Sequence, residues 1–184
     1  ALRHQYLYEK EKIKKNRNYN ILVPLGMLND SVKLINFLYK SPINTSKYNI
    51  IIRCHPIVNL EQIRKRLNFN HDEKFSVSSI ANIKEDLRRV DIVIYTSTTV
   101  CIEALMMGIP VIHIDLNEPI TIDPLFRMND LKWVVTKEEE LPMIIENIYA
   151  LDGLELSELQ DKARKAIQDY LSEVNEDKLK EFIE

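Results

Sequence analysis

The fold of this chain is decided by residues 91–112, which read DIVIYTSTTVCIEALMMGIPVI. The run from Asp91 to Tyr95 predicts a buried strand, and a hydroxyl-rich turn then leads into a short helix from Thr98 to Met107. The Gly108-x-Pro110 break is typical of a helix stop, and Val111 to Ile114 predicts a second buried strand. A strand that feeds a helix through small polar residues leaves backbone amides pointing outward, where the helix dipole favours an anion.

The turn itself carries four hydroxyl side chains, on Thr96, Ser97, Thr98 and Thr99. Their hydroxyls and amides could bind phosphate oxygens, although Thr98 would act equally well as an ordinary N-cap. Glu103 stands on an otherwise apolar helix, where a carboxylate needs a partner. A ribose diol would supply two hydroxyl donors, and a salt bridge to a neighbouring helix is the alternative. A phosphate together with a sugar hydroxyl indicates a nucleotide.

Strands and helices alternate along the rest of the chain. We expect further strands at Tyr19–Leu25, Tyr48–Cys54, Lys74–Val77 and Lys132–Val135, and helices at Leu2–Lys15, Val32–Tyr39, Leu60–Leu67, Ile83–Arg89, Glu138–Ala150 and Ser157–Ile183. The expected N-caps are Asn29-Asp30-Ser31, Asn59, Asn82 and Thr136. Residues 116–130 show no such pattern and predict a functional loop at the sheet edge. The alternation predicts a doubly wound α/β fold, Rossmann-like, with about six parallel strands and helices on both faces.

Composition restricts the class of protein. Hydrophobic residues make up 45% of the 184 residues and charged residues 29%, as is ordinary for a globular protein. The net charge of −3 argues against a nucleic-acid partner, and no apolar run approaches the length of a membrane span. Cys54 and Cys101 lie among apolar residues, which predicts buried free thiols in a reducing compartment. Because the chain begins at Ala1, we expect a fragment or a processed chain.

Three residues at the ends of predicted strands are further site candidates. His55 ends a central strand at the carboxyl edge, where open α/β sheets bind ligands; it could bind phosphate or assist the leaving group, or simply form a His-Pro turn. Gly26 could let the backbone approach a ligand, or merely end a strand. Arg53 could reach phosphate or lie at the surface. We expect no metal ion, because the acids after the strand Val111–Ile114 show no recurring ligand spacing.

Taken together, these motifs resemble the C-terminal, nucleotide-sugar-binding half of GT-B glycosyltransferases. The residues that carry the resemblance are His55-Pro56, Asp86-Leu87-Arg88-Arg89-Val90-Asp91, Ser97-Thr98-Thr99 and the run EALMMGIPVI at 103–112. The resemblance is nearest to bacterial capsule and surface-polysaccharide transferases, including sialic-acid and Kdo-type enzymes, and it covers residues 1–150. UDP-sugar epimerases of the same fold carry a similar Glu-Ala-x-x-x-Gly-x-Pro run. Many relatives have Gly-Gly where this chain has Ser97-Thr98, so hydroxyls and amides would have to form the phosphate turn.

The resemblance implies a domain organisation and a function. Residues 1–184 would form one nucleotide-sugar-binding domain, with a lead-in interdomain helix at 1–18, a Rossmann-like core at 19–150 and a C-terminal helix at 155–184. The substrate would be a UDP- or CMP-linked sugar, with no cofactor, and His55 would be the catalytic residue. The acceptor-binding N-terminal half, which usually supplies the catalytic base, is missing, so this chain should bind without turnover. Half of a nucleotide-sugar 2-epimerase and a non-catalytic scaffold domain are the alternatives. We expect a cytoplasmic protein, whose full-length form could associate peripherally with the inner face of the membrane.

Overall fold

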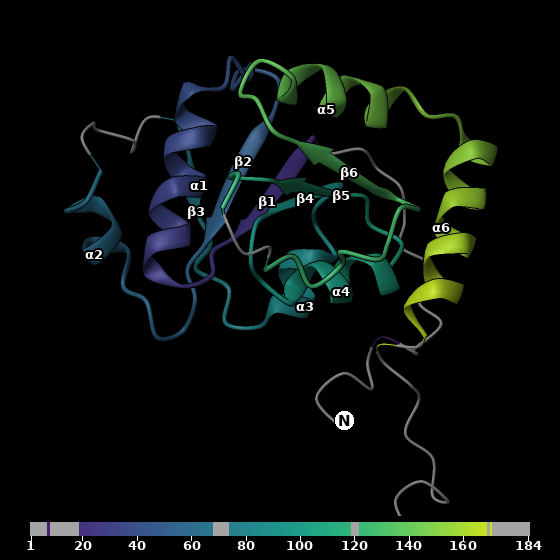
Figure 1. The fold of residues 1–184 in the computed structure, drawn as a ribbon, viewed down its shortest axis with the longest axis horizontal. Helices are drawn as coiled ribbons and strands as arrows, with labels where there is room; N and C mark the ends of the chain where they lie inside the picture. The colour runs from purple at the N-terminus through teal and green to yellow at the C-terminus, as the bar shows by residue number, and fades with distance from the viewer. Residues whose placement is uncertain (1–6, 8–18, 68–73, 119–121, 169, 171–184) are drawn as a thin grey trace, which may run out of the picture.

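The computed structural model of the chain describes residues 7, 19–67, 74–118, 122–168 and 170. Six strands form one sheet in the order β3-β2-β1-β4-β5-β6, and every pairing is parallel (Figure 1). The strands are β1 (Asn20–Pro24), β2 (Asn49–Arg53), β3 (Ser76–Val77), β4 (Ile92–Tyr95), β5 (Val111–Ile114) and β6 (Lys132–Val135). The helices are α1 (Leu28–Lys40), α2 (Leu60–Arg64), α3 (Ile83–Leu87), α4 (Val100–Met106), α5 (Leu141–Ala150) and α6 (Gly153–Ile167).

Each face of the sheet packs against its own set of helices. On one face Ile92 and Ile94 of β4 join a core formed with α1, α2 and α5. On the other face Val93 and Tyr95 join a core formed with α3, α4 and α6. Successive strand residues point to opposite faces, so a strand buried on both sides reads as the continuous apolar run seen in β4. The predicted doubly wound α/β fold with about six parallel strands is confirmed.

Helix starts were the least accurate predictions. The helix α1 begins at Leu28, not Val32, so the expected caps Asn29, Asp30 and Ser31 lie inside its first turn. The Ser31 hydroxyl instead donates to the carbonyl oxygens of Gly26 and Met27, at 3.1 and 2.8 Å. An N-cap side chain accepts from amides instead, but serine makes both kinds of local bond, so its presence does not fix where the helix begins.

Two of the three other predicted caps are correct. Asn59 and Asn82 cap α2 and α3 as predicted, each accepting a hydrogen bond at 2.9 Å from the amide two residues on. The predicted cap Thr136 is wrong: α5 begins only at Leu141, because the Glu140 carboxylate binds the amides just after β6 in a separate turn.

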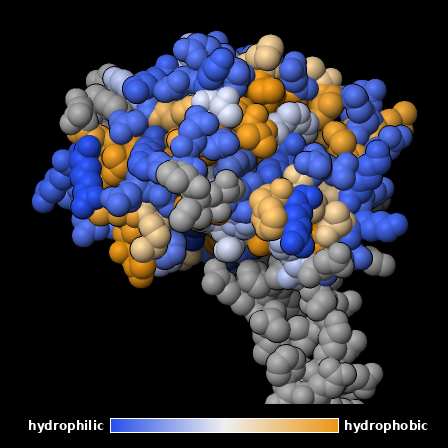
Figure 2. Space-filling view, viewed as in Figure 1, coloured by the Kyte–Doolittle hydropathy of each residue, from blue (hydrophilic) through white to orange (hydrophobic). Residues whose placement is uncertain are grey.

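The last helix also begins earlier than predicted. The helix α6 begins at Gly153, earlier than the predicted Ser157, because Asp152 accepts hydrogen bonds from two amides of its first turn. Apart from Leu7 and Tyr170, the predicted helix Leu2–Lys15 and the final part of Ser157–Ile183 lie outside the described residues. Within the described part of the chain, no helix has the length and apolar character needed to cross a bilayer. The view in Figure 2 shows hydrophobic side chains in small groups among hydrophilic ones.

Candidate functional site

The centre of the sheet contains a topological switch point. The strands β1 and β4 are neighbours, but the chain leaves β1 through α1 on one face and β4 through α4 on the other. In open α/β sheets the two loops that diverge in this way bound a crevice outside the carboxyl ends of the strands, and ligands bind there. The loop after β1 carries Gly26, and the turn after β4 carries Thr96 to Thr99.

The structure brings Gly26 directly against this turn. A Cβ atom added at Gly26 would lie only 2.8 Å from Ser97 Oγ and 3.6 Å from the Ser97 carbonyl oxygen. The φ angle of Gly26 is not positive, since Gly108 is the one glycine with that conformation among the described residues. Gly26 is therefore needed for close approach between the two loops, an alternative to both roles expected from the sequence.

Three of the four hydroxyl residues in the turn are buried or hydrogen-bonded within the protein. The Ser97 hydroxyl donates to Asp30 Oδ2 at 2.8 Å, which ties the turn to the first turn of α1. Thr96 and Thr98 are buried, and Thr98 Oγ1 accepts a long hydrogen bond of 3.4 Å from the Val100 amide. Thr99 is exposed and occupies the N-cap position of α4 without a side-chain cap bond. A ligand would thus meet Thr99 and the exposed parts of Ser97 first.

His55 lies one strand away on the same carboxyl edge, just after β2. Its side chain is half-buried, and Nδ1 accepts a hydrogen bond of 3.3 Å from the Ile57 amide. Its carbonyl oxygen accepts another from the Val58 amide at 3.0 Å. These two bonds form a His-Pro turn, the structural role considered for His55. Because the side-chain bond uses Nδ1, a contact between Nε2 and phosphate remains a prediction.

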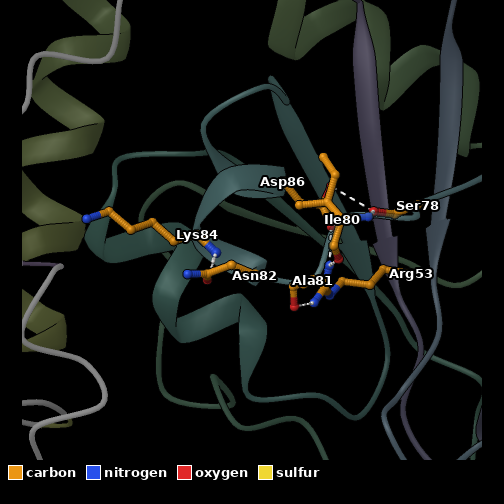
Figure 3. A network of polar contacts seen from close by, with 7 residues as sticks. All are labelled: Arg53, Ser78, Ile80, Ala81, Asn82, Lys84 and Asp86. Atoms are coloured by element: carbon orange, nitrogen blue, oxygen red, sulfur yellow. Dashed lines mark hydrogen bonds and ion pairs between the residues drawn. The ribbon is translucent and has the colours of Figure 1, made fainter.

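Arg53 braces the loop that follows β3 (Figure 3). Its Nη1 donates to the Ile80 carbonyl oxygen at 2.7 Å and forms an ion pair with Asp86, and Nη2 donates to the Ala81 carbonyl oxygen at 2.9 Å. Ser78 Oγ contacts both Asp86 oxygens, at 2.9 and 2.8 Å. The Asp86 side chain is 4% exposed and the Arg53 side chain 18%, so the ion pair between them is largely buried. Sequence reasoning found Arg53 but missed its carboxylate partner on the buried side of α3.

Glu103 is buried on α4, with only 2% of its surface exposed. It has an interaction partner within the protein. A ribose would therefore have to reach a carboxylate that is largely covered, and the ribose role remains a prediction.

A buried cluster of polar side chains next to the turn was not predicted from the sequence. The members of this cluster are Tyr95, His113, Asp123 and Lys132. Tyr95 Oη donates to Asp123 Oδ1 at 2.7 Å, Lys132 Nζ donates to Asp123 Oδ2 at 2.6 Å, and His113 Nδ1 lies 3.8 Å from the same Oδ2. The alternation rule could have placed Tyr95 and His113 side by side, because they are register partners in β4 and β5. The pairing with Asp123, in the pattern-free loop, could not have been found in this way.

The cluster has a definite charge distribution. Burial raises the pKa of Asp123, but hydrogen bonds from Lys132, the Leu125 amide and Tyr95 lower it overall, so Asp123 is an anion. Burial lowers the pKa of His113, which keeps the imidazole neutral near pH 7, and burial raises the pKa of Tyr95. Lys132 supplies the compensating positive charge.

The two cysteines and the possible metal ligands were also considered in the sequence. Both Cys54 and Cys101 are free thiols; Cys101 is buried as expected, whereas Cys54 is partly exposed, which corrects the prediction for that residue. Burial raises the pKa of both thiols. Among the described residues, no three His, Cys, Asp or Glu side chains are grouped so that they could hold a metal ion.

Comparison with known proteins gives similarity of structure alone. No family model matches the chain, and no curated protein sequence matches it. HepE of Anabaena, solved in complex with UDP-glucose, has a TM-score of 0.56 at 17% identity, over 84% of this chain and 44% of that one. WaaG, a glycosyltransferase involved in lipopolysaccharide biosynthesis, has a TM-score of 0.55 at 15% identity, over 92% of this chain and 47% of that one. The C-terminal domain of LpcC, a group 1 glycosyl transferase of Francisella tularensis, has a TM-score of 0.50 at 13% identity, over 95% of both chains.

These similarities define the fold. The chain spans less than half the length of HepE and WaaG, but nearly the whole isolated C-terminal domain of LpcC. The prediction that the fold is that of the C-terminal half of a GT-B glycosyltransferase is confirmed.

Proposed function

We propose that this chain is the donor-binding domain of a glycosyltransferase that uses a nucleotide sugar and acts in surface-polysaccharide synthesis. The observation that carries the proposal is the close approach of Gly26 to Ser97 at the switch point, where the loops after β1 and β4 converge. Ligands of doubly wound sheets bind at this position. The fold shared with glycosyltransferases, one of them solved with UDP-glucose, supports a nucleotide sugar as that ligand.

The turn from Thr96 to Thr99 would hold the donor phosphates. Its amides and the exposed Thr99 hydroxyl would donate to the phosphate oxygens, and Ser97 would join them when it releases Asp30. Donors fixed by the protein are effective where negative charge develops, because they need no reorganisation during the reaction. They would stabilise the nucleoside diphosphate or monophosphate as it leaves the sugar.

Other residues would complete the donor site. His55 would contact the phosphates through Nε2 and assist the leaving group as the catalytic residue of this half. Glu103, which is buried on α4, would accept hydrogen bonds from the ribose hydroxyls. Arg53 would act through the loop that it braces, and Gly26 through the position of Ser97. No cofactor is needed beyond the UDP- or CMP-linked sugar.

The remaining chemistry would need groups that this chain does not supply. An acceptor-binding N-terminal half would supply the catalytic base, so the domain alone should bind the donor without turnover. The full-length protein would be cytoplasmic and could associate with the inner face of the membrane, where polysaccharide acceptors are built.

Thermal unfolding with added nucleotides tests this function. A ligand at 100 times its dissociation constant stabilises the folded state by about 2.7 kcal/mol. In a domain of this size that corresponds to roughly 5–10 °C. We expect such shifts with UDP or CMP and with the corresponding nucleotide sugars. A scaffold domain would show none, and no shift with any pyrimidine nucleotide would refute the proposal.

A matched pair of variants locates the binding. Thr99→Val keeps the shape of the side chain and removes the exposed hydroxyl, which makes no cap bond. Its unfolding temperature without ligand should stay close to that of the wild type, while the nucleotide-induced shift should shrink. Thr45→Val is the control, because Thr45 is exposed before β2, at the opposite edge of the sheet. Equal ligand shifts in both variants would place the nucleotide elsewhere.

A further inference from the structure

The cluster of Tyr95, His113, Asp123 and Lys132 lies next to the turn that we assign to phosphate. Tyr95 is the last residue of β4, and the turn begins at the next residue. His113 is its register partner in β5, with the two ring centroids 5.2 Å apart. The backbone of Thr96 lies near enough to the imidazole to raise its pKa. His113 therefore packs against the end of β4 and lies close to the start of the turn.

Asp123 is already fully engaged by other groups. Its side chain is 3% exposed and accepts from Tyr95, from Lys132 and from the Leu125 amide, at 2.7, 2.6 and 2.9 Å. Lys132 also donates to the Leu125 carbonyl oxygen at 2.7 Å. The Asp123–Lys132 pair is therefore complete without a proton on His113, whose Nδ1 remains 3.8 Å from Asp123 Oδ2.

The charged and titratable groups around His113 come from every neighbouring element. Tyr95 faces it from β4, Asp115 and Asp123 from the segment after β5, and Lys132 from β6. Burial, which is the largest effect, and Lys132 lower the pKa of His113, while Asp123, Asp115 and the backbone of Thr96 raise it. The neutral imidazole is therefore the resting form near pH 7, and a nearby negative charge would shift the balance toward the imidazolium.

We propose that His113 is a positioning residue for the Thr96–Thr99 turn and that it takes up a proton when a phosphate group binds there. The inference rests on the proposed function, because it needs phosphate at that turn. A bound phosphate adds negative charge beside a buried imidazole, where charges interact strongly. Coupling between two sites is reciprocal, so protonation of His113 must strengthen phosphate binding by the same factor. Affinity should therefore rise as the pH falls.

Calorimetric titration of the 184-residue chain with UDP tests the coupling. Titrations at pH 6 in two buffers of different ionisation enthalpy give the number of protons taken up on binding. The phosphate of UDP titrates in the same range, so the informative quantity is the difference between the wild type and His113→Gln, which stays neutral. We expect the wild type to take up more protons. Between pH 7.5 and pH 5.5, the affinity of the wild type for UDP should also rise about threefold more than the affinity of His113→Gln. This factor is the expected coupling between phosphate binding and protonation of His113.

His55→Gln is the matched control, because the other imidazole near the site could bind the proton instead. We expect His55→Gln to weaken binding while keeping the extra proton uptake. If His55→Gln abolishes the uptake and His113→Gln keeps it, the inference is overturned. Equal uptake in the wild type and His113→Gln would overturn it too. If the wild type binds neither UDP nor CMP, both the proposed function and this inference are refuted.

A measurement on the wild type covers the case in which His113→Gln does not fold. The imidazole resonances of His113 can be followed by NMR between pH 5 and 8, with and without saturating UDP. We expect its titration midpoint to move upward on binding by about half a pH unit, which corresponds to the threefold coupling. An unchanged or lower midpoint would overturn the inference.

Discussion

Gly26→Ala should destabilise the domain through one specific contact. The added Cβ would lie 2.8 Å from Ser97 Oγ, too close for any ordinary contact, whereas the next nearest atom is at 3.6 Å. The Ser97 hydroxyl must therefore rotate and give up its hydrogen bond to the Asp30 carboxylate. A hydrogen bond to a charged group is worth about 1.5–3 kcal/mol. Replacing glycine by alanine at a compatible backbone position stabilises the fold by about 0.4–1 kcal/mol, because it lowers the conformational entropy of the unfolded chain. The net loss in the free energy of unfolding should be about 1–2 kcal/mol, measured by urea denaturation.

Two control variants isolate this contact. In a Ser97→Ala background the hydroxyl is gone, so Gly26→Ala should be neutral or slightly stabilising, and the double-mutant cycle should give a coupling of about 1.5 kcal/mol. Gly153→Ala is the matched glycine, because a Cβ there meets no atom within 4 Å and Gly153 opens α6. It should stabilise by roughly 0.5–1 kcal/mol. If Gly26→Ala costs the same in both backgrounds, the two loops do not meet as the structure describes.

Four other changes test separate parts of the site. Asp30→Asn removes a negative charge from the turn, so the affinity for UDP measured by calorimetry should rise about fivefold, near 1 kcal/mol; weaker binding would contradict this. The wild type should prefer UDP to its 2′-deoxy form by about tenfold if Glu103 holds the ribose, and Glu103→Gln should reduce that preference. Arg53→Met leaves Asp86 without its buried cation and should cost about 2–4 kcal/mol in urea denaturation, and Arg53→Lys should recover part of it. The free energy of unfolding should fall as the pH drops below about 6.5, because unfolded His113 binds a proton that the buried imidazole, with its lowered pKa, does not; His113→Gln should flatten this slope.

The fold could be predicted because its determinants are local. Each central strand is buried on both faces and therefore reads as a continuous apolar run, and each run is separated from the next by a helical segment. Parallel strands with helical crossovers then follow from the alternation alone. The helix starts were less accurate, because the Ser31 hydroxyl binds backbone carbonyls from inside the first turn of α1, and the Glu140 carboxylate binds amides before α5 instead of capping that helix.

The site could be predicted only as far as the edge of the sheet. Sequence reasoning placed Gly26, His55 and the turn at the carboxyl ends of strands, and the structure finds them there. The partners of the site residues are distant in the chain: Asp30 is 67 residues from Ser97, and Asp123 is 28 residues from Tyr95. Neither pairing leaves a periodic signal, because it depends on how the loops pack after the sheet has formed.

The Ser97–Asp30 hydrogen bond links the stability of the domain to its proposed function. The first turn of α1 and the turn after β4 both lie at the amino ends of helices, where free backbone amides favour negative charge. In the domain without ligand, the Asp30 carboxylate supplies that charge and holds the two loops together. A phosphate bound at the turn would compete with Asp30 for the same hydroxyl donor. Donor binding would then replace the Asp30 carboxylate with a phosphate. Because the Ser97–Asp30 hydrogen bond stabilises the fold, breaking it would lower the net free energy of binding. The same carboxylate that makes the empty domain more stable should therefore make it a weaker binder.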